Sequence, residues 1–546
     1  MLRSRLTSPF GVACAAAILL GCVIRARPVV LSDFPLNDGG LFYLMSDELR
    51  GAGYRLPTFT EYNAARIPFA YPPFGFYAAA ALADVTSLDL VQVVRLLPLV
   101  TTCATLVAFL LLARSMMTDR VAIVASVTAF ALVPRSFTWL VMGGGLTRAF
   151  GFLFTILALH QAYLLFTRRD LRFAVSAGAF TGLTPLSHLG TAPFLAASLV
   201  LFFLAYGRHR QGVLGAAIIG ALAVVVSAPW WAAVAAEHGF APFLAAGQTG
   251  GSVLSSGRLR EVVIGRLARF GVATTGEPLF PIIGVLALFG ALAAVRRRSV
   301  AIPAWWVMTL AVDVRAGTTY ATLPLSLLAG LGVSDVLLPL LTTGRIGARA
   351  DQPRASQPEA SVPTLRRSWS ERIREQGFAV AVLGFFVIYG SLGALTRDDD
   401  LGTENAYLSS LSRDERDAMR WVAANTPLSS RFLVVPEEGW AADKAAEWFP
   451  ALARRPSVAT VQGREWLPDR SFARYSALHD YALRCGGEDV RCLDRWTDSS
   501  GTSFSHVFIP KSPDGACCRQ LSSALRADPR YALVFDGPGA EIFLRR

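Results

Sequence analysis

The chain reads Asp33-Phe34-Pro35-Leu36-Asn37-Asp38-Gly39-Gly40-Leu41-Phe42-Tyr43 and, farther on, Tyr71-Pro72-Pro73-Phe74-Gly75-Phe76-Tyr77, at the two ends of one polar stretch. This stretch follows an N-terminal apolar run and precedes a long series of further apolar segments. It carries acids, arginines and aromatics where a plain membrane anchor would have a short polar turn. We therefore expect an outer loop with a chemical role, set between membrane-spanning helices.

The composition is that of a polytopic membrane protein. The 546 residues are 53% hydrophobic and 17% charged, with a mean hydropathy of +0.43, which is too apolar for one soluble domain of this length. The formal charge of +12 does not indicate nucleic-acid binding, because residues 396–546 hold 20 basic and 22 acidic residues. The excess lies in the apolar part, where about 19 of the arginines fall in loops that we place in the cytoplasm, the positive-inside pattern.

Apolar runs long enough to cross a bilayer recur along the chain. The first is expected to remain uncleaved, because no clear small-residue cleavage site follows residues 10–24. Arg-rich turns decide which helix ends face the cytoplasm. We predict about eleven transmembrane helices, at 6–24, 91–113, 121–140, 149–166, 173–187, 190–206, 212–232, 278–295, 300–312, 318–342 and 377–395.

The short apolar segment 71–85 follows two prolines and is predicted to lie along the outer interface. If it crossed the membrane, every later helix would invert and the Arg-rich turns would lie outside, which the positive-inside rule disfavours. In the favoured arrangement the chemically interesting positions share one face of the membrane. They are Asp33, Asp38, Gly143–Arg148, His188, 233–276 and Asp313–Arg315.

The predicted domains follow from these segments. They are a transmembrane domain at 1–342 with outer loops 25–90 and 233–276, a cytoplasmic loop at 343–374, a last transmembrane helix at 375–395, and an extracytoplasmic soluble α/β domain at 396–546. The loop 343–374 is rich in Arg, Ser, Pro and Gln, which predicts disorder.

The C-terminal region mixes helix and strand signals. Helical spacing over 414–424 ends at Thr426-Pro427. Strands are predicted at 432–435 and 458–461, and a closing hairpin at 531–535 and 542–544. Four cysteines in an exported domain suggest one or two disulfides of open connectivity; they are Cys485, Cys492, Cys517 and Cys518.

An acid outside a first transmembrane helix, then Phe42-Tyr43, then Pro72-Pro73-Phe74-Gly75, resembles the first outer loop of the GT-C membrane glycosyltransferases. The resemblance is to the branch of the protein O-mannosyltransferases and the lipid A aminoarabinose transferases, which take a sugar from a polyprenyl-phosphate lipid. It covers the first outer loop and the general layout of the membrane part, and it implies a GT-C-like α-helical membrane fold. Those families usually carry a second acid beside the first, whereas Gly39-Gly40 follows here.

Asp38 is the leading candidate for a catalytic base. Sugar transfer to a hydroxyl needs a group that takes the hydroxyl proton, and a carboxylate at the membrane face can do this. The departure at Gly39-Gly40 leaves the assignment open between Asp38 and Asp33. The competing interpretation is that Asp38 caps the next helix in an Asn-Asp-Gly turn.

Two outer arginines are candidates for binding the donor phosphate, whose negative charge needs neutralising as it leaves. Arg148 follows three glycines at the start of a helix, and glycines let a backbone approach a ligand closely. Arg315 follows Asp313 at the mouth of the helix 318–342. The alternative for both is an arginine that snorkels to lipid headgroups or pairs with a neighbouring acid.

Tyr43, His188 and Asp313 are predicted to contact substrate. His188 lies where two helices meet at the outer surface, and its alternative role is that of a hydrogen-bonded turn residue. The arginine-rich segment 258–270 predicts an interfacial helix beside the donor site or a plain headgroup anchor. The sequence has no secure metal-ligand spacing, although a divalent metal could be held if Asp33, Asp38, Asp313 and His188 converge.

The predicted function is transfer of a sugar from a polyprenyl-phosphate donor to a cell-envelope glycan, lipid or protein at the outer face of the cell membrane. An oligosaccharide transferase or polymerase of the same fold is the alternative. A lipid or sugar transporter is the competing class, which ionisable residues buried within helices would favour; Asp335 is the main such residue. An envelope-assembly scaffold would not need acids and arginines gathered on one face.

Overall fold

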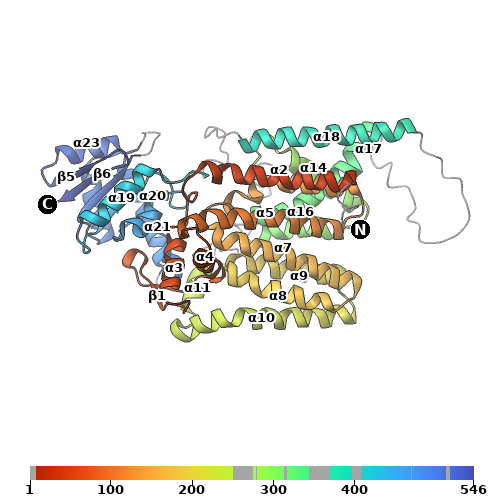
Figure 1. The fold of residues 1–546 in the computed structure, drawn as a ribbon, viewed down its shortest axis with the longest axis horizontal. Helices are drawn as coiled ribbons and strands as arrows, with labels where there is room; N and C mark the ends of the chain where they lie inside the picture. The colour runs from red at the N-terminus through yellow and green to blue at the C-terminus, as the bar shows by residue number, and fades with distance from the viewer. Residues whose placement is uncertain are drawn as a thin grey trace, which may run out of the picture.

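The computed structural model describes residues 8–249, 275–277, 280–312, 317–343, 369–395, 408–468, 470–511 and 517–546. The molecule is elongated, with a bundle of long helices at one end and a small sheet with its covering helices at the other (Figure 1). The C-terminus lies in the sheet-bearing end, and the N-terminal helix runs along the bundle toward that end (Figure 1).

Six helical stretches of the described chain are long and apolar enough to cross a membrane. Spanning a bilayer takes about 20 apolar residues, and a helix satisfies its own backbone hydrogen bonds in lipid. Each stretch coincides with a predicted one. They are α2 (Pro9–Leu31), α5 (Leu90–Met116), α7 (Gly145–Arg168), η4 with α9 (Leu189–Tyr206), α10 (Arg210–His238), and Thr318–Thr342 within α16 and α17.

A seventh stretch is bent. Helix α6 (Arg120–Leu132) is followed by the short turns η2 (Pro134–Ser136) and η3 (Thr138–Leu140), and the two parts meet at 81°. Pro134 has no backbone N–H and disfavours helical geometry in the residue before it, so the helix ends there. The turn that follows leads directly into Gly143–Arg148, the loop singled out in the sequence.

The other predicted spans are also helical, but they are shorter or carry more charge. They are α8 (Arg172–Ser187), α14 (Ile282–Arg296), α15 (Ala301–Val312) and α18 (Trp369–Leu395). The total of about eleven transmembrane helices therefore stays a prediction. The segment after the two prolines forms the 12-residue helix α4 (Phe74–Val85), which packs against α3 (Gly40–Gly51), α5 and α7.

Three helices extend into segments that were predicted as loops. Helix α2 continues to Leu31, α10 continues to His238 and is followed by α11 (Ala241–Thr249), and α18 begins at Trp369, within the segment predicted to be disordered. Residues 250–274 and 344–368 lie outside the described residues. The difference arises because a helix can extend beyond the apolar run on which a predicted span is based.

Arg25 shows the reason clearly. The sequence placed it in the outer loop, but it is fully buried in α2. Its guanidinium donates to the carbonyls of Phe130 and Ala131, at 3.3 and 2.8 Å, and to Ser136 Oγ at 2.9 Å. The bend after α6 leaves carbonyls without helical partners, and a guanidinium with five donors can satisfy them. Arg25 therefore ties α2 to the bent segment.

Helix α16 (Gly317–Gly332) passes through a π turn, Val333–Leu337, into α17 (Leu338–Thr343). Asp335 in this turn pairs with Arg297, which follows α14, at 2.6 Å. Asp335, the residue that most favoured a transporter, therefore forms an ion pair with the arginine that follows α14.

The first outer region folds into its own small layer. Helix α3 is followed by the two-residue strands β1 (Phe59–Thr60) and β2 (Ile67–Pro68), with η1 (Tyr62–Ala64) between them, and then by α4. Tyr62, Ile67 and Phe76 are fully buried in the apolar cluster under this layer. The layer lies between the helical bundle and the sheet-bearing end (Figure 1).

The C-terminal sheet has four strands in the order β3-β4-β6-β5. Strand β3 (Phe432–Val434) pairs parallel to β4 (His506–Pro510), and β6 (Ala540–Arg545) is antiparallel to β4 and to β5 (Tyr531–Asp536). The predicted closing hairpin is confirmed. The covering helices are α19 (Arg413–Asn425), α20 (Lys444–Ala453), α21 (Ser471–Cys485), α22 (Val490–Ser500) and α23 (Arg519–Ala527).

The strand predicted at 458–461 was wrong. One isolated bridge joins Ser457 to Phe432, and the chain then turns. Thr460 donates its hydroxyl to the carbonyl of Ala446, 2.8 Å away, so the segment packs onto α20 instead of extending the sheet. Tertiary contacts here override the β-branched composition that suggested a strand. The predicted helix after Ser412 is confirmed, with a capping box between Ser412 and Glu415.

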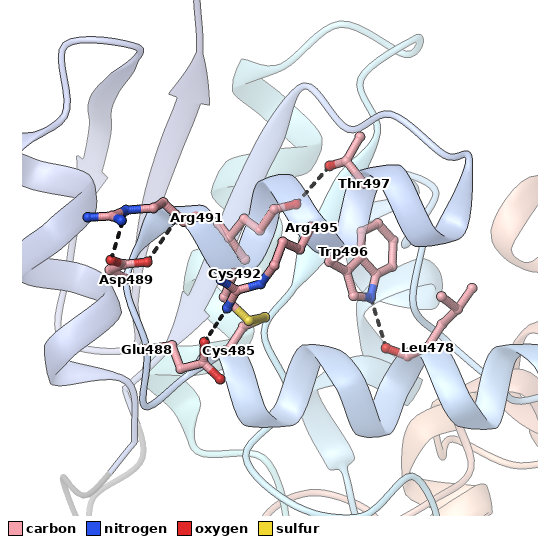
Figure 2. Close-up of a disulfide and its surroundings, with 10 residues drawn as sticks. Leu478, Cys485, Glu488, Asp489, Arg491, Cys492, Arg495, Trp496 and Thr497 are labelled. Atoms are coloured by element: carbon pink, nitrogen blue, oxygen red, sulfur yellow. Dashed lines mark hydrogen bonds and ion pairs between the residues drawn. A yellow bond between two sulfur atoms is a disulfide. The ribbon is translucent and has the colours of Figure 1, made fainter.

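The cysteines of this region are paired. Figure 2 shows the disulfide Cys485–Cys492, which joins the end of α21 to α22 across seven residues. Beside it, the indole N–H of Trp496 donates to the carbonyl of Leu478 at 2.9 Å, a second link between the same helices (Figure 2). Cys517 and Cys518 form the other disulfide. Both pairings agree with the prediction of one or two bridges in an exported domain.

Candidate active site

The loop before α7 touches the first outer loop backbone to backbone. A Cβ atom on Gly143 would lie 1.9 Å from the carbonyl oxygen of Asp38, and one on Gly144 would lie 2.3 Å from Asp38 Oδ2. The amide of Gly143 donates to the carbonyl of Leu36 at 3.0 Å. The glycines therefore serve close approach, and what they approach is the Asp38 loop itself.

Both oxygens of the Asp38 carboxylate are engaged. Oδ1 accepts from the backbone N–H of Gly144 at 2.7 Å, and Oδ2 accepts from Arg148 Nη2 at 2.7 Å. Asp38 is 14% exposed and Arg148 is 24% exposed, so the pair is mostly withdrawn from water. The N-terminus of α7 adds a favourable dipole for the carboxylate. The base candidate and one phosphate candidate thus form a single constellation.

Arg148 is held in a fixed direction. Its Nε donates to the carbonyl of Trp139 at 2.9 Å, and its guanidinium lies over the Trp139 ring, 5.7 Å from the centroid. Trp139 belongs to η3, so the bend in α6 supplies the surface on which the guanidinium rests. A planar guanidinium oriented in this way presents its fork to an anion in one geometry.

A third charged side chain arrives from the C-terminal region. Glu447 on α20 accepts a hydrogen bond from the backbone N–H of Gly39, at 2.8 Å from Oε1. Glu447 is buried, and burial together with the negative charge of Asp38 raises the pKa of its carboxyl to about 8. Sequence reasoning missed this residue. The available signal was an acid on the apolar face of Ala445–Ala453, the buried side of α20.

Asp33 is placed in a different ion pair. Its carboxylate binds Arg416 Nη2 at 2.5 Å, and the guanidinium of Arg416 lies over the ring of Phe34, 4.7 Å from its centroid. The Asp33 side chain is 69% exposed, whereas Arg416 is 9% exposed. Asp33 thus links the first outer loop to α19, and the structure does not join it to the Asp38–Arg148 pair.

Tyr43 and His188 make contacts with residues other than that pair. Tyr43 packs on Trp448, with ring centroids 6.0 Å apart, and burial raises the pKa of its hydroxyl. His188 ends α8, and its Nδ1 lies 2.7 Å from Thr191 Oγ1, which in turn lies 3.0 Å from the hydroxyl of Tyr320. Asp313, Arg315 and the segment 258–270 lie outside the described residues.

Within the described residues, no group of three or more His, Cys, Asp and Glu side chains is arranged to hold a metal ion. Asp38 and Asp33 are each engaged by an arginine, and His188 is bonded within its own turn. The three described members of the proposed metal set therefore do not converge.

No protein-family model matches the chain, and no curated protein matches it in sequence. Its fold is similar to several solved structures. The archaeal oligosaccharyltransferase AglB of Archaeoglobus fulgidus is 14% identical with a TM-score of 0.55, and the match covers 91% of this chain and 69% of AglB. ArnT of Cupriavidus metallidurans is 13% identical with a TM-score of 0.50, over 98% of each chain.

The arabinofuranosyltransferase AftD from Mycobacteria is 16% identical with a TM-score of 0.56, and the match covers 98% of this chain but 40% of AftD. These three proteins are membrane glycosyltransferases of the GT-C fold. The chain therefore has the GT-C fold, as the outer-loop resemblance implied. The AglB structure contains an inhibitory peptide and a dolichol-phosphate, and the ArnT structure is bound to undecaprenyl phosphate.

Proposed function

We propose that this protein is a glycosyltransferase that moves a sugar from a polyprenyl-phosphate donor to a cell-envelope acceptor at the outer face of the membrane. The observation that carries the proposal is the Asp38–Arg148 pair, a carboxylate and a guanidinium joined at 2.7 Å where two polar loops meet on a GT-C fold. The lipid phosphates bound to AglB and ArnT support a donor of that chemical class.

In the proposed reaction, an acceptor hydroxyl oxygen attacks the anomeric carbon of the donor sugar. A glycosidic C–O bond forms, and the bond from the anomeric carbon to the phosphate oxygen breaks. The hydroxyl proton passes to Asp38, and the bond electrons leave with the polyprenyl phosphate. General-base help of this kind contributes about 10²- to 10⁴-fold to a rate, and a cation at the leaving phosphate stabilises the charge that develops.

The ion pair gives this proposal a specific first step. An arriving phosphate competes with Asp38 for the Arg148 guanidinium, which Trp139 already orients. When the phosphate takes Nη2, Asp38 Oδ2 loses its partner, while Oδ1 stays on the amide of Gly144. The base then has one free oxygen only when a donor is in place. Arg315 is the second proposed phosphate ligand, and Tyr43, His188 and Asp313 remain proposed substrate contacts.

The fold also favours one second candidate. AglB is an oligosaccharyltransferase, and its likeness to this chain is of the same order as that of ArnT. Transfer of a preassembled oligosaccharide needs the same base and the same phosphate neutralisation, so the Asp38–Arg148 geometry serves either reaction. The size of the lipid-linked glycan that accumulates in a deletion strain, measured by mass spectrometry, distinguishes the two.

The donor site is tested by binding. Purified protein in micelles is titrated with a short-chain polyprenyl-phosphate sugar. Arg148→Ala is expected to weaken binding about 10- to 150-fold, because a charge-assisted contact to phosphate is worth roughly 1.5–3 kcal/mol. Arg148→Lys should recover part of the loss, since lysine lacks the planar fork.

Arg50→Ala is the matched control, because Arg50 belongs to the same outer layer and is also paired with an aspartate, Asp84. It should bind as wild type does. Absence of saturable binding in wild type, or equal affinity in wild type and Arg148→Ala, would remove the basis of the proposal.

A further inference from the structure

We infer that Glu447, a residue of the C-terminal region, is a positioning residue of the candidate site. It fixes the loop that carries Asp38, and it leaves a single negative carboxylate beside Arg148. The inference rests on the proposed function, because it concerns the same site. It adds an acid 408 residues away in the chain, on an element that the outer-loop resemblance does not include.

The contact is a helix cap provided from another part of the molecule. Helix α3 begins after Gly39, which has φ 126° and no side chain to cap the helix, and its first turn contains no acid. The carboxyl of Glu447 accepts from the N–H of Gly39 at this end. A Cβ on Gly40 would lie 2.7 Å from the carbonyl oxygen of Glu447, so a larger residue there would push α20 away. The Gly39-Gly40 pair therefore makes room for an acid from elsewhere.

The residues on either side of Asp38 are fastened to the same region. The carbonyl of Asn37 accepts from the indole N–H of Trp448 at 3.0 Å, and the Asn37 side chain donates to the carbonyl of Ala441 at 3.2 Å. The hydroxyl of Tyr62 donates to the carbonyl of Glu447 at 2.6 Å. Asp38 thus lies between two residues that α20 and its flanking turn hold in place, so movement of α20 moves the carboxylate.

The charges explain why the identity of the acid matters. Glu447 interacts with Asp38, which disfavours its ionised form, and with Arg148, which favours it. Burial is the larger cause, and it favours the neutral carboxylic acid at pH 7. One negative charge then faces Arg148 at neutral pH, and a second appears as Glu447 ionises. A second carboxylate opposes a phosphate that must bind the same guanidinium.

Other titratable groups lie on the elements packed against Glu447. They are Asp443 directly before α20, Lys444 on α20, Tyr43 and Asp47 on α3, Tyr62 on η1, and Glu415 and Arg416 on α19. Glu465 on η8 (Arg464–Trp466) lies near enough to Tyr62 to interact with it electrostatically, as Glu447 does. Burial raises the pKa of Tyr43 and Tyr62 above their ordinary value of 10, and raises that of Glu465 to about 7. The Glu465 carboxyl accepts hydrogen bonds from the backbone of its own turn, at Gly463 and at Glu465. Glu465 is therefore a matched control.

The test measures binding of a short-chain polyprenyl phosphate to the full chain in micelles from pH 7.5 to 9.5. The second ionisation of a phosphate monoester lies near pH 6, so the ligand charge is constant over this range. Wild type is expected to bind about 5- to 10-fold more weakly at pH 9.5 than at pH 7.5, the order expected for one partly screened charge near the site. Glu447→Gln keeps an acceptor for the Gly39 N–H and cannot ionise, so its affinity should stay level across the range.

Glu465→Gln should show the same decline as wild type, and Glu447→Ala should weaken binding at every pH because the Gly39 N–H loses its partner. A Glu447→Gln variant that declines with pH as wild type does overturns the inference. If wild type binds and Arg148→Ala does not, the proposed function stands even then. If wild type fails to bind at pH 7.5, the proposed function fails with it.

Discussion

At the residue scale, Asp38 and Asp33 differ in surroundings although they lie five positions apart. Asp38 is withdrawn from water and paired with an arginine that an aromatic ring orients, whereas Asp33 is 69% exposed and pairs with an arginine on α19. A general base must lie within hydrogen-bond reach of the proton that it takes, and an enclosed carboxylate beside a cation can meet both the acceptor and the donor phosphate. We therefore propose Asp38 as the base, and we propose that Asp33 joins the first outer loop to α19.

Replacement of each acid by its amide tests this distinction. Asp38→Asn is expected to lower turnover by at least about 10²-fold, the usual scale for loss of a general base. Asp33→Asn should lower turnover far less, because the substitution weakens a partly exposed ion pair worth about 1 kcal/mol or less. Turnover is measured as transfer of radiolabelled sugar from extracted lipid donor, with protein yield as the folding control. Near-wild-type turnover in Asp38→Asn would exclude it as the base.

Sequence reasoning reached this pair because each member carried a local signal. Asp38 lies in the outer loop that resembles the first outer loop of the GT-C family, and Arg148 follows three glycines at the start of a helix. The direct contact between Asp38 and Arg148 was not predicted, because the three glycines before Arg148 were expected to approach a ligand and not the Asp38 loop. Glu447 carried no comparable signal, because its role depends on a contact across 408 positions. Arg25 misled the prediction, because arginine is expected at membrane surfaces and here it satisfies carbonyls inside the bundle.

At the scale of elements, the bend after α6 and the start of α7 form one unit. The bend provides Trp139, and the start of α7 provides Gly144 and Arg148. The Arg148 guanidinium is therefore held between the bend and the start of α7. Gly144 has φ −67°, a value that alanine adopts without strain. The effect of a side chain at this position can therefore be separated from an effect on the backbone.

Gly144→Ala is expected to fold normally and to lose the donor. The added Cβ would lie 2.3 Å from Asp38 Oδ2 and 2.6 Å from Arg148 Nη2, so both side chains must move apart. We expect at least about 10-fold weaker binding of polyprenyl-phosphate sugar, because both charge-assisted contacts are displaced, with little change in melting temperature. Gly51→Ala is the control, since nothing lies within 4 Å of its Cβ position. Unchanged affinity in Gly144→Ala would show that the pair is not part of the donor site.

At the scale of the whole molecule, the membrane-spanning helices were predictable because long apolar runs and Arg-rich turns act over short distances in sequence, and the GT-C fold was implied by the resemblance of the first outer loop. The way in which the C-terminal region sits on the outer layer was not, because it depends on single contacts such as Trp466 with Tyr71, whose ring centroids lie 4.8 Å apart. The orientation in the membrane remains a prediction from charge.

Accessibility from outside the cell tests the orientation. Cysteines introduced at Leu428, which is 81% exposed, and at the exposed Glu61 should react with an impermeant thiol reagent in intact cells. A cysteine at the exposed Ser299, beside the arginines that follow α14, should react only after the membrane is opened. Wild-type protein gives the background from native thiols. Labelling at Ser299 with none at Leu428 would contradict the predicted orientation and would indicate that the site faces the cytoplasm.

The contacts between α20 and the Asp38 loop have a consequence for the synthesis of the protein. A ribosome delivers residues 33–43 long before it reaches Glu447 and Trp448, and every intervening segment must be inserted first. The nascent chain therefore carries its reactive loop without the cap and the indole that hold it. Under the proposed function, a partly synthesised copy, or one cut before α20, would have a loose Asp38 loop and would be inactive, so activity would begin only after α20 has packed against that loop.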